Sequence, residues 1–209
     1  MRGPFRLRLA ASWTMKRRLL LGITGASGMP YALRLFEALS RVEGAEVHVL
    51  LSNAALEILP LECEVDAEAF ISRAAAVYFE RDLAAPPASG SWRHEGMVLC
   101  PCSMATLGAV AQGLGHNLIH RAADVTLKEG RRLVLVVRET PLHAIHLQNM
   151  LSAARAGAVI MPASPGFYHR PTQLQDIVDH IVGRILDRLG IDNSLAPRWG
   201  ESGGEGREP

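Results

Sequence analysis

The sequence predicts an α/β protein with a Rossmann-like, flavodoxin-like fold, in which helices cover both faces of a doubly wound, mostly parallel sheet in three α/β/α layers. Short apolar segments of strand length alternate with amphipathic segments of helix length along the chain, which is the pattern of β–α–β units. Each helical segment is long enough to cross over between parallel strands. A chain of 209 residues has room for one substantial domain but not for two of ordinary size.

The strands are expected where β-branched and other apolar residues form short runs bounded by polar or glycine-rich turns. They are Leu19–Thr24, Val47–Leu51, Val77–Phe79, Met97–Cys100, Leu133–Val137 and Ala158–Met161. Between Phe79 and Met97, the run from Ala84 to Ser91 has no periodicity and is rich in Pro, Ser and Gly, so it is expected to be a loop.

The helices are expected to begin at hydroxyl-bearing residues that can cap a free backbone N–H. Ser52 and Ser103 each precede such a helix, and Thr140 followed by Pro141 fits the N-cap and first position of another. The expected helices are Tyr31–Leu39, those opened by Ser52 and Ser103, Asn117–Glu129, Thr140 to about Ala156, and Leu174–Leu189.

Composition excludes several function classes. The formal net charge is +1, from 22 basic and 21 acidic residues, so no basic field favours nucleic acid. No apolar run reaches about 18 residues, so no membrane span is expected. Three cysteines indicate a reducing compartment rather than a disulfide scaffold, and we expect a cytoplasmic protein.

One Rossmann-like domain is expected over residues 15–195, flanked by two short segments. Residues 1–14 carry Arg2, Arg6 and Arg8 without an acidic residue, a composition loosely typical of a transit peptide. The favoured alternative is that Met15 starts the functional chain and residues 1–14 are an extension. Residues 196–209 are expected to form a tail whose Gly- and Glu-rich end, Glu201–Pro209, is disordered.

Small and hydroxyl-bearing residues follow three of the expected strands. Gly25, Ala26, Ser27 and Gly28 form the first β–α turn, where backbone N–H groups meet a positive helix terminus. The turn departs from the G-x-G-x-x-G fingerprint, and no acidic residue closes the second strand to bind a ribose. Ser52 and the run Ser103, Met104, Ala105 and Thr106 repeat the arrangement on other strands. Each alone would be a tight turn or an N-cap, but together they favour flavin mononucleotide (FMN) over a dinucleotide.

Charged residues supply a candidate anion site. Arg138 interrupts the carboxyl end of an apolar strand, and guanidinium suits bidentate phosphate. Glu139 beside it is a candidate to relay a proton to a leaving group. Arg121 and Lys128 lie seven residues apart on one helix with Asp124 between them, so a solvated ion-pair face is the alternative there.

Histidine and cysteine pairs are weaker candidates. His143 and His146 are spaced i, i+3 without a third ligand on the same helix, so zinc is disfavoured and no metal site is expected. Cys100 and Cys102 do not form a C-x-x-C pair, and Cys102 is expected to be a small core residue.

Over about Lys16 to Gly200, the sequence resembles the flavin prenyltransferase family of the UbiX/Pad type. The motifs that carry the resemblance are Gly25–Gly28, Pro86–Ser91, Pro101–Thr106, Arg121–Val125 with Leu127–Glu129, Arg138–Leu142 with His146-Leu147, Gly157–Pro162 and Pro165–His169. The resemblance implies metal-independent transfer of a dimethylallyl group from dimethylallyl phosphate to N5 and C6 of reduced FMN. The product, prenylated FMN, would serve UbiD-type decarboxylases. It also implies a homo-oligomer, commonly a dodecamer, with sites between subunits.

The resemblance also assigns residues. It implies that FMN is bound by Gly25, Ala26, Ser27, Ser52, Ser103, Met104, Ala105, Thr106 and Arg138. It implies that the allylic phosphate is bound and activated by Lys128, Arg138, Glu139, Tyr168 and Arg184, with Ser27 and Glu62 assisting and Trp199 closing over the prenyl group. Without it, Arg184 and Trp199 would be a surface residue and part of a tail. The chain departs from the family pattern at Asn53, where Lys is common, and at Gly130, where Arg is usual.

Two other functions remain alternatives. An FMN-dependent cysteine decarboxylase of related fold would carry Pro-Ala-Ser-Ala-Asn-Thr where this chain has Pro101–Thr106, and the missing Asn disfavours it. A non-catalytic FMN carrier for a partner decarboxylase would bind FMN but would not need Lys128, Tyr168 or Arg184.

Overall fold

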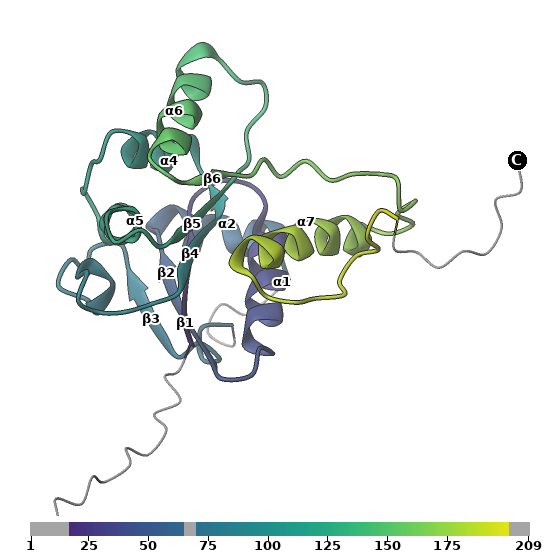
Figure 1. The fold of residues 1–209 in the computed structure, drawn as a ribbon, viewed down its shortest axis with the longest axis horizontal. Coiled ribbons are helices and arrows are strands. Elements are labelled where there is room, and N and C mark those ends of the chain that lie inside the picture. Colours follow the sequence, from purple (N-terminus) through teal and green to yellow (C-terminus); the bar gives the residue numbers. More distant parts are fainter. Residues whose placement is uncertain (1–16, 65–69, 201–209) are drawn as a thin grey trace, which may run out of the picture.

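The computed structural model describes residues 17–64 and 70–200. Its centre is a parallel sheet with the strand order β3-β2-β1-β4-β5-β6 (Figure 1). The strands are β1 (Arg17–Ile23), β2 (Ala45–Leu51), β3 (Ala76–Phe79), β4 (Gly96–Cys102), β5 (Arg132–Val137) and β6 (Val159–Ile160). Every strand expected from the sequence is present within two residues of its expected ends.

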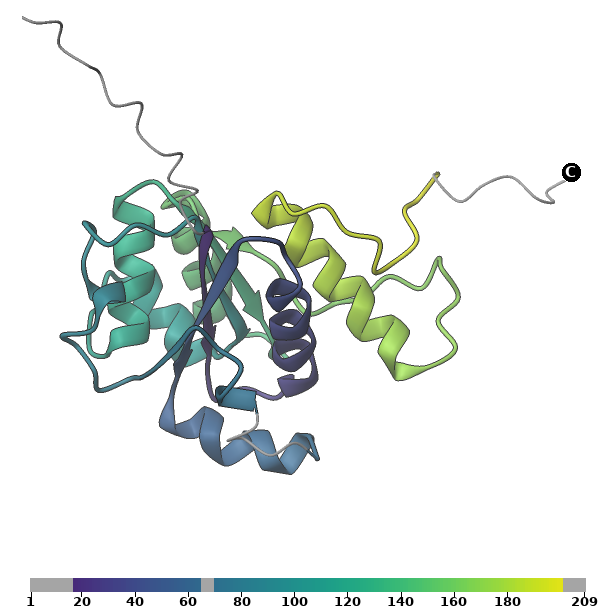
Figure 2. The same cartoon turned by 90° about the horizontal axis from the view of Figure 1, so that it is seen from below.

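Helices cover both faces of this sheet, and a separate hydrophobic cluster lies under each layer. On one face α1 (Met29–Ser40), α2 (Asn53–Glu62) and α7 (Leu174–Leu189) pack against the strands, with α1 and α7 side by side (Figure 2). On the other face lie α4 (Met104–Ala111), α5 (Leu118–Lys128) and α6 (Ala144–Arg155). The predicted three-layer, doubly wound α/β fold is therefore confirmed.

Two local predictions need correction. Thr140 does not cap α6, because the chain bends at Thr140 and Pro141 and neither residue is helical. The Thr140 N–H donates to Glu139 Oε1 at 3.0 Å. The helix begins at Ala144 instead, where the His143 side chain accepts the His146 N–H. The expected loop from Ala84 to Ser91 contains one 3₁₀ turn, Pro86–Ala88.

The strand order places a topological switch point between β1 and β4. The chain passes from β1 to β2 on one side and from β4 to β5 on the other, so the connections after β1 and β4 diverge. Ligands of open α/β sheets bind outside the carboxyl ends of strands at such a point. The segments there are residues 24–28 and 103–106, called the switch-point loops below.

Two predictions on the ends of the chain lie outside the described residues, namely the extension 1–14 and the disordered end Glu201–Pro209. Within residues 17–64 and 70–200, no helix is both long enough and apolar enough to span a bilayer.

Candidate active site

A buried threonine joins the two switch-point loops. The Thr24 hydroxyl donates a hydrogen bond of 2.8 Å to the Pro101 carbonyl and accepts one of 2.8 Å from the Ser103 N–H. Thr24 is only 1% exposed. Its side chain therefore fixes the start of α4 relative to the turn that begins α1. The sequence prediction did not include Thr24 among the site residues.

Glu62, at the end of α2, reaches the N-terminus of α1. Its carboxylate accepts hydrogen bonds from the N–H groups of Gly28 at 2.7 Å and Met29 at 2.8 Å, and also bonds the Ser27 hydroxyl. Partial burial acts to raise the pKa of the Glu62 carboxyl, but these hydrogen bonds and the nearby Arg138 charge outweigh it and lower that pKa. Glu62 is therefore an anion at neutral pH, held at a helix N-terminus.

Arg138, directly after β5, lies over the same turn. Its Nε donates to the Ser27 carbonyl at 3.1 Å, and its charge acts on Glu62. Three predicted residues from distant parts of the chain thus converge on the α1 N-terminus: Ser27, Glu62 and Arg138. Glu139 follows Arg138 and is exposed.

The hydroxyl-bearing helix starts are present as expected. Ser52 caps α2 by accepting the Ala55 N–H at 3.0 Å, and Ser103 caps α4 by accepting the Thr106 N–H at 3.2 Å. Gly25 lies so close to the start of α2 that a Cβ on it would collide with Ala54. The absence of that Cβ lets the turn between β1 and α1 lie against the first turn of α2.

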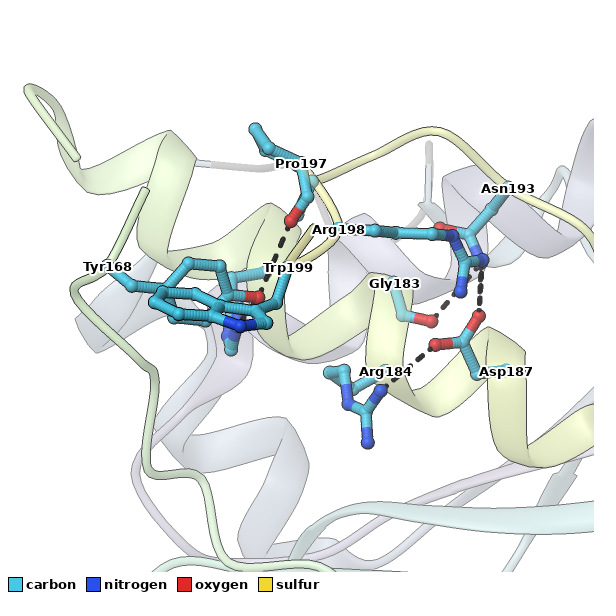
Figure 3. Close-up of a pocket in the computed structure, with 10 residues that line it drawn as sticks. Tyr168, Gly183, Arg184, Asp187, Asn193, Pro197, Arg198 and Trp199 are labelled. Carbon is cyan, nitrogen blue, oxygen red and sulfur yellow. Dashed lines mark hydrogen bonds and ion pairs between the residues drawn. The ribbon is translucent and has the colours of Figure 1, made fainter. Parts of the chain in front are cut away.

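A second group of predicted residues lies beside α7, apart from the switch-point loops. Tyr168, Arg184 and Trp199 line a cavity of about 280 Å³, called the α7 pocket below (Figure 3). Its other lining residues are His180, Gly183, Asp187, Asn193, Ala196, Pro197 and Arg198. The Trp199 ring meets the Tyr168 ring edge-on, with centroids 5.3 Å apart.

His180 supports the tyrosine from within α7. Its Nδ1 accepts the Gly166 N–H at 3.5 Å, and its Nε2 lies 3.4 Å from the Tyr168 hydroxyl. His180 is only 8% exposed. Sequence reasoning missed this contact, since a single histidine on a helix gives no signal of its partner.

Lys128 lies neither at the switch-point loops nor in the α7 pocket. It is the last residue of α5, just before β5 begins, whereas Arg138 follows the end of β5. The strand between them has six residues, so the two sites are separated by about 20 Å, the length of that strand. Lys128 is exposed and its Nζ pairs with Glu129 Oε1 at 2.6 Å, beside Gly90. One chain therefore does not bring Lys128 and Arg138 together.

Known proteins share both this fold and much of this sequence. The family model described as Flavoprotein matches residues 10–186. A flavin prenyltransferase UbiX of Pseudomonas aeruginosa is 50% identical over 198 residues, covering 88% of this chain and 94% of the relative. The chain belongs to the UbiX-type flavin prenyltransferase family.

Solved structures of UbiX-type proteins superpose closely. The structure of AnUbiX (PadA1) in complex with FMN and dimethylallyl pyrophosphate is 43% identical, with a TM-score of 0.86, and covers 91% of this chain and all of that chain. A dodecameric FMN-dependent UbiX-like decarboxylase from Escherichia coli O157:H7 is also 43% identical, with a TM-score of 0.85 over 87% of this chain and 98% of the other.

The weaker candidates from the sequence have structural explanations in this family member. The rings of His143 and His146 stack 3.5 Å apart at the start of α6, and no group of three or more His, Cys, Asp or Glu side chains in the described part of the chain could hold a metal ion. Cys102 is fully buried, and burial raises the pKa of its thiol to about 12. It is a core residue, as predicted. Arg121 pairs with Asp124 at 2.8 Å, which is the ion pair given above as the alternative for this helix face.

Proposed function

We propose that this chain is a flavin prenyltransferase that transfers a dimethylallyl group from dimethylallyl phosphate to N5 and C6 of reduced FMN and delivers prenylated FMN to a UbiD-type decarboxylase. The observation that carries this proposal is the convergence of Ser27, Glu62 and Arg138 at the switch point of a UbiX-type fold. A relative with the same fold is described in complex with FMN and dimethylallyl pyrophosphate.

The switch-point loops fit a flavin phosphate and ring. The close approach of Gly25 to Ala54 and the capped starts at Ser52 and Ser103 place backbone N–H groups and hydroxyls along one sheet edge, where an anion is favoured. The residues proposed to bind FMN are Gly25, Ala26, Ser27, Ser52, Ser103, Met104, Ala105, Thr106 and Arg138. Reduced FMN would supply the nucleophilic atoms of the reaction.

The allylic phosphate requires cations, because a monophosphate is a poor leaving group without charge neutralisation. Arg138 at the switch point is one candidate cation, and Lys128 and Arg184 are the others. Glu139 is proposed to supply or relay the proton that the departing phosphate needs. The aromatic faces of Tyr168 and Trp199 would shelter a developing allyl cation from water.

A homo-oligomer would complete this site. Within one chain, neither Lys128 nor the α7 pocket lies beside Arg138. The proposed chemistry nevertheless requires Lys128, Arg138 and the residues of the α7 pocket at one site. One solved UbiX-like relative is dodecameric, and the subunits of closed oligomers present different surfaces to one another at heterologous interfaces. We therefore propose that Lys128, Tyr168, Arg184 and Trp199 reach the flavin of a neighbouring copy.

The direct test is product analysis. The protein is loaded with FMN, reduced, and incubated anaerobically with dimethylallyl phosphate. The expected product is a flavin heavier by one C5H8 unit, detected by mass spectrometry. A Glu139→Gln variant should retain FMN but form this product more slowly. Unmodified flavin from a folded, FMN-loaded wild-type protein would instead favour a carrier.

A further inference from the structure

The chain folds back along α7 after that helix ends. Gly190 adopts a left-handed conformation (φ 72°) at the C-terminus of α7, and the following residues return over the helix toward Tyr168 (Figure 3). Ile191 is 7% exposed and packs on the core. Residues 190–199 are called the strap below. Without anchors, a polar terminal segment of this kind would fray.

The first anchor of the strap is Asn193, which sits on a glycine of α7. The Asn193 amide donates to the Gly183 carbonyl at 3.2 Å, and a Cβ on Gly183 would lie 2.9 Å from Asn193 Oδ1. Glycine inside a helix costs about 1 kcal/mol relative to alanine. The missing Cβ of Gly183 leaves room for the Asn193 side chain, which explains why a glycine stands inside α7.

The second anchor is Asp187, which binds the strap with one oxygen and an α7 arginine with the other. Its Oδ1 accepts from Arg198 at 2.9 Å and from the Asn193 amide at 3.1 Å, while its Oδ2 faces Arg184 at 3.4 Å. The Asp187 side chain is 22% exposed, against 51% for Arg184. The contact with Arg184 is the longest of the three.

The end of the strap reaches the aromatic wall of the α7 pocket. The Tyr168 hydroxyl donates to the Pro197 carbonyl at 3.4 Å, and Trp199, next to Arg198, meets the Tyr168 ring. Arg198, which Asp187 fixes, is therefore the residue immediately before the ring that covers Tyr168.

We propose that Asp187 is a positioning residue of the prenyl-transfer site, holding Arg184 directly and Trp199 through Arg198 in the lining of the α7 pocket. This inference rests on the proposed function, which assigns Arg184 to the allylic phosphate and Trp199 to the prenyl chain. When phosphate binds Arg184, the long Oδ2 contact gives way, whereas Oδ1 keeps the strap and Trp199 in place. Asp187 is proposed to act through these two residues and not by binding either substrate.

The test compares Asp187→Asn with Asp179→Asn in the full-length, FMN-loaded oligomer. Asp179 is on the same helix and pairs with Arg34 of α1 at 2.5 Å, outside the α7 pocket. The Asp187→Asn variant loses the partly exposed ion pair with Arg198. Amide hydrogen exchange in the strap is therefore expected to become about fivefold faster. The kcat/KM for dimethylallyl phosphate is expected to fall by a similar factor. FMN affinity and Tm should match those of Asp179→Asn. Asp187→Glu, which keeps the charge, should recover most of the wild-type kcat/KM.

Arg198→Gln provides a second variant that leaves α7 unchanged. It should speed exchange of the strap as Asp187→Asn does, and it remains informative if Asp187→Asn fails to fold. The inference is overturned if either folded variant has a wild-type kcat/KM, or if strap exchange is unchanged. A wild-type protein that forms no prenylated flavin overturns the proposed function and the inference with it. An active wild type with an equally active Asp187→Asn variant overturns the inference alone.

Discussion

The Thr24 hydroxyl bonds the backbone N–H of Ser103 across the switch point, at 2.8 Å. These residues are far apart in the sequence, yet they end neighbouring strands, β1 and β4. Because Thr24 also donates to the Pro101 carbonyl, one buried side chain fixes both loops that are proposed to bind the flavin. The geometry of the proposed flavin site therefore depends on a residue that need not touch the flavin.

Replacing Thr24 by the isosteric valine is expected to weaken both folding and FMN binding. The partly buried Ser103 N–H would lose its partner, and the Pro101 carbonyl would keep only the Thr24 backbone N–H at 3.3 Å. This loss costs about 1–3 kcal/mol in the free energy of unfolding. Urea unfolding and FMN titration measure the two effects. Thr126→Val is a matched control, since its buried hydroxyl donates to the Ala122 carbonyl inside α5. The Thr126→Val protein should be less stable but should bind FMN as tightly as the wild type. Equal FMN affinity in the Thr24→Val and Thr126→Val variants would contradict the role given to Thr24.

Glu62→Gln is expected to lower stability in a pH-dependent way. Because the folded protein lowers the pKa of this carboxyl below its ordinary value of 4.5, the charged form stabilises the fold above that pH. This contribution is lost as pH falls through the lowered pKa. Denaturant titrations at several pH values should therefore show wild type and variant differing at pH 7 and converging in acid. A difference that stays constant with pH would show that the Glu62 charge is not responsible.

The sequence was sufficient for the fold because each strand and most helices are specified locally. The buried run Leu133–Val137 and the capped start at Ser52 need no distant partner to be recognised. The predicted start of α6 was wrong, because Thr140 and Pro141 match a local capping pattern, whereas the chain bends at these residues and His143 caps the helix.

The site was less predictable, because its geometry depends on pairs that are distant in the sequence. Nothing local to Thr24 or Asp187 indicates that one joins two loops and the other holds the strap. Only the family resemblance grouped Ser27, Glu62 and Arg138. In the structure, Ser27 is hydrogen-bonded to both Glu62 and Arg138. Lys128 shows the converse, since its motif matches the family while its position in one chain lies far from Arg138.

His94 should make the protein sensitive to mild acid. Burial, followed by the nearby Arg131 charge, lowers the pKa of this imidazole to about 4. Between pH 6.5 and 4 the unfolded chain binds a proton that the folded chain does not, so stability falls as pH decreases through that range. The full effect is about 3 kcal/mol, from a shift of this size. In His94→Gln this part of the pH dependence should disappear from urea unfolding; an unchanged slope would assign the acid sensitivity to other groups.

Mixed oligomers should reveal whether the site is shared between subunits. Lys128→Ala and Arg138→Ala are each expected to reduce turnover strongly, by about a hundredfold, because each removes a cation from the phosphate. If these residues reach one site from different chains, co-expressing the two variants in equal amounts leaves about a quarter of the sites intact in a symmetric assembly. Turnover should then recover to a similar fraction of wild type. The matched control pairs Arg138→Ala with Ser27→Ala, since Arg138 Nε bonds the Ser27 carbonyl of its own chain and no mixture can restore both. No recovery in the first mixture, or equal recovery in the control, would contradict a site shared between subunits.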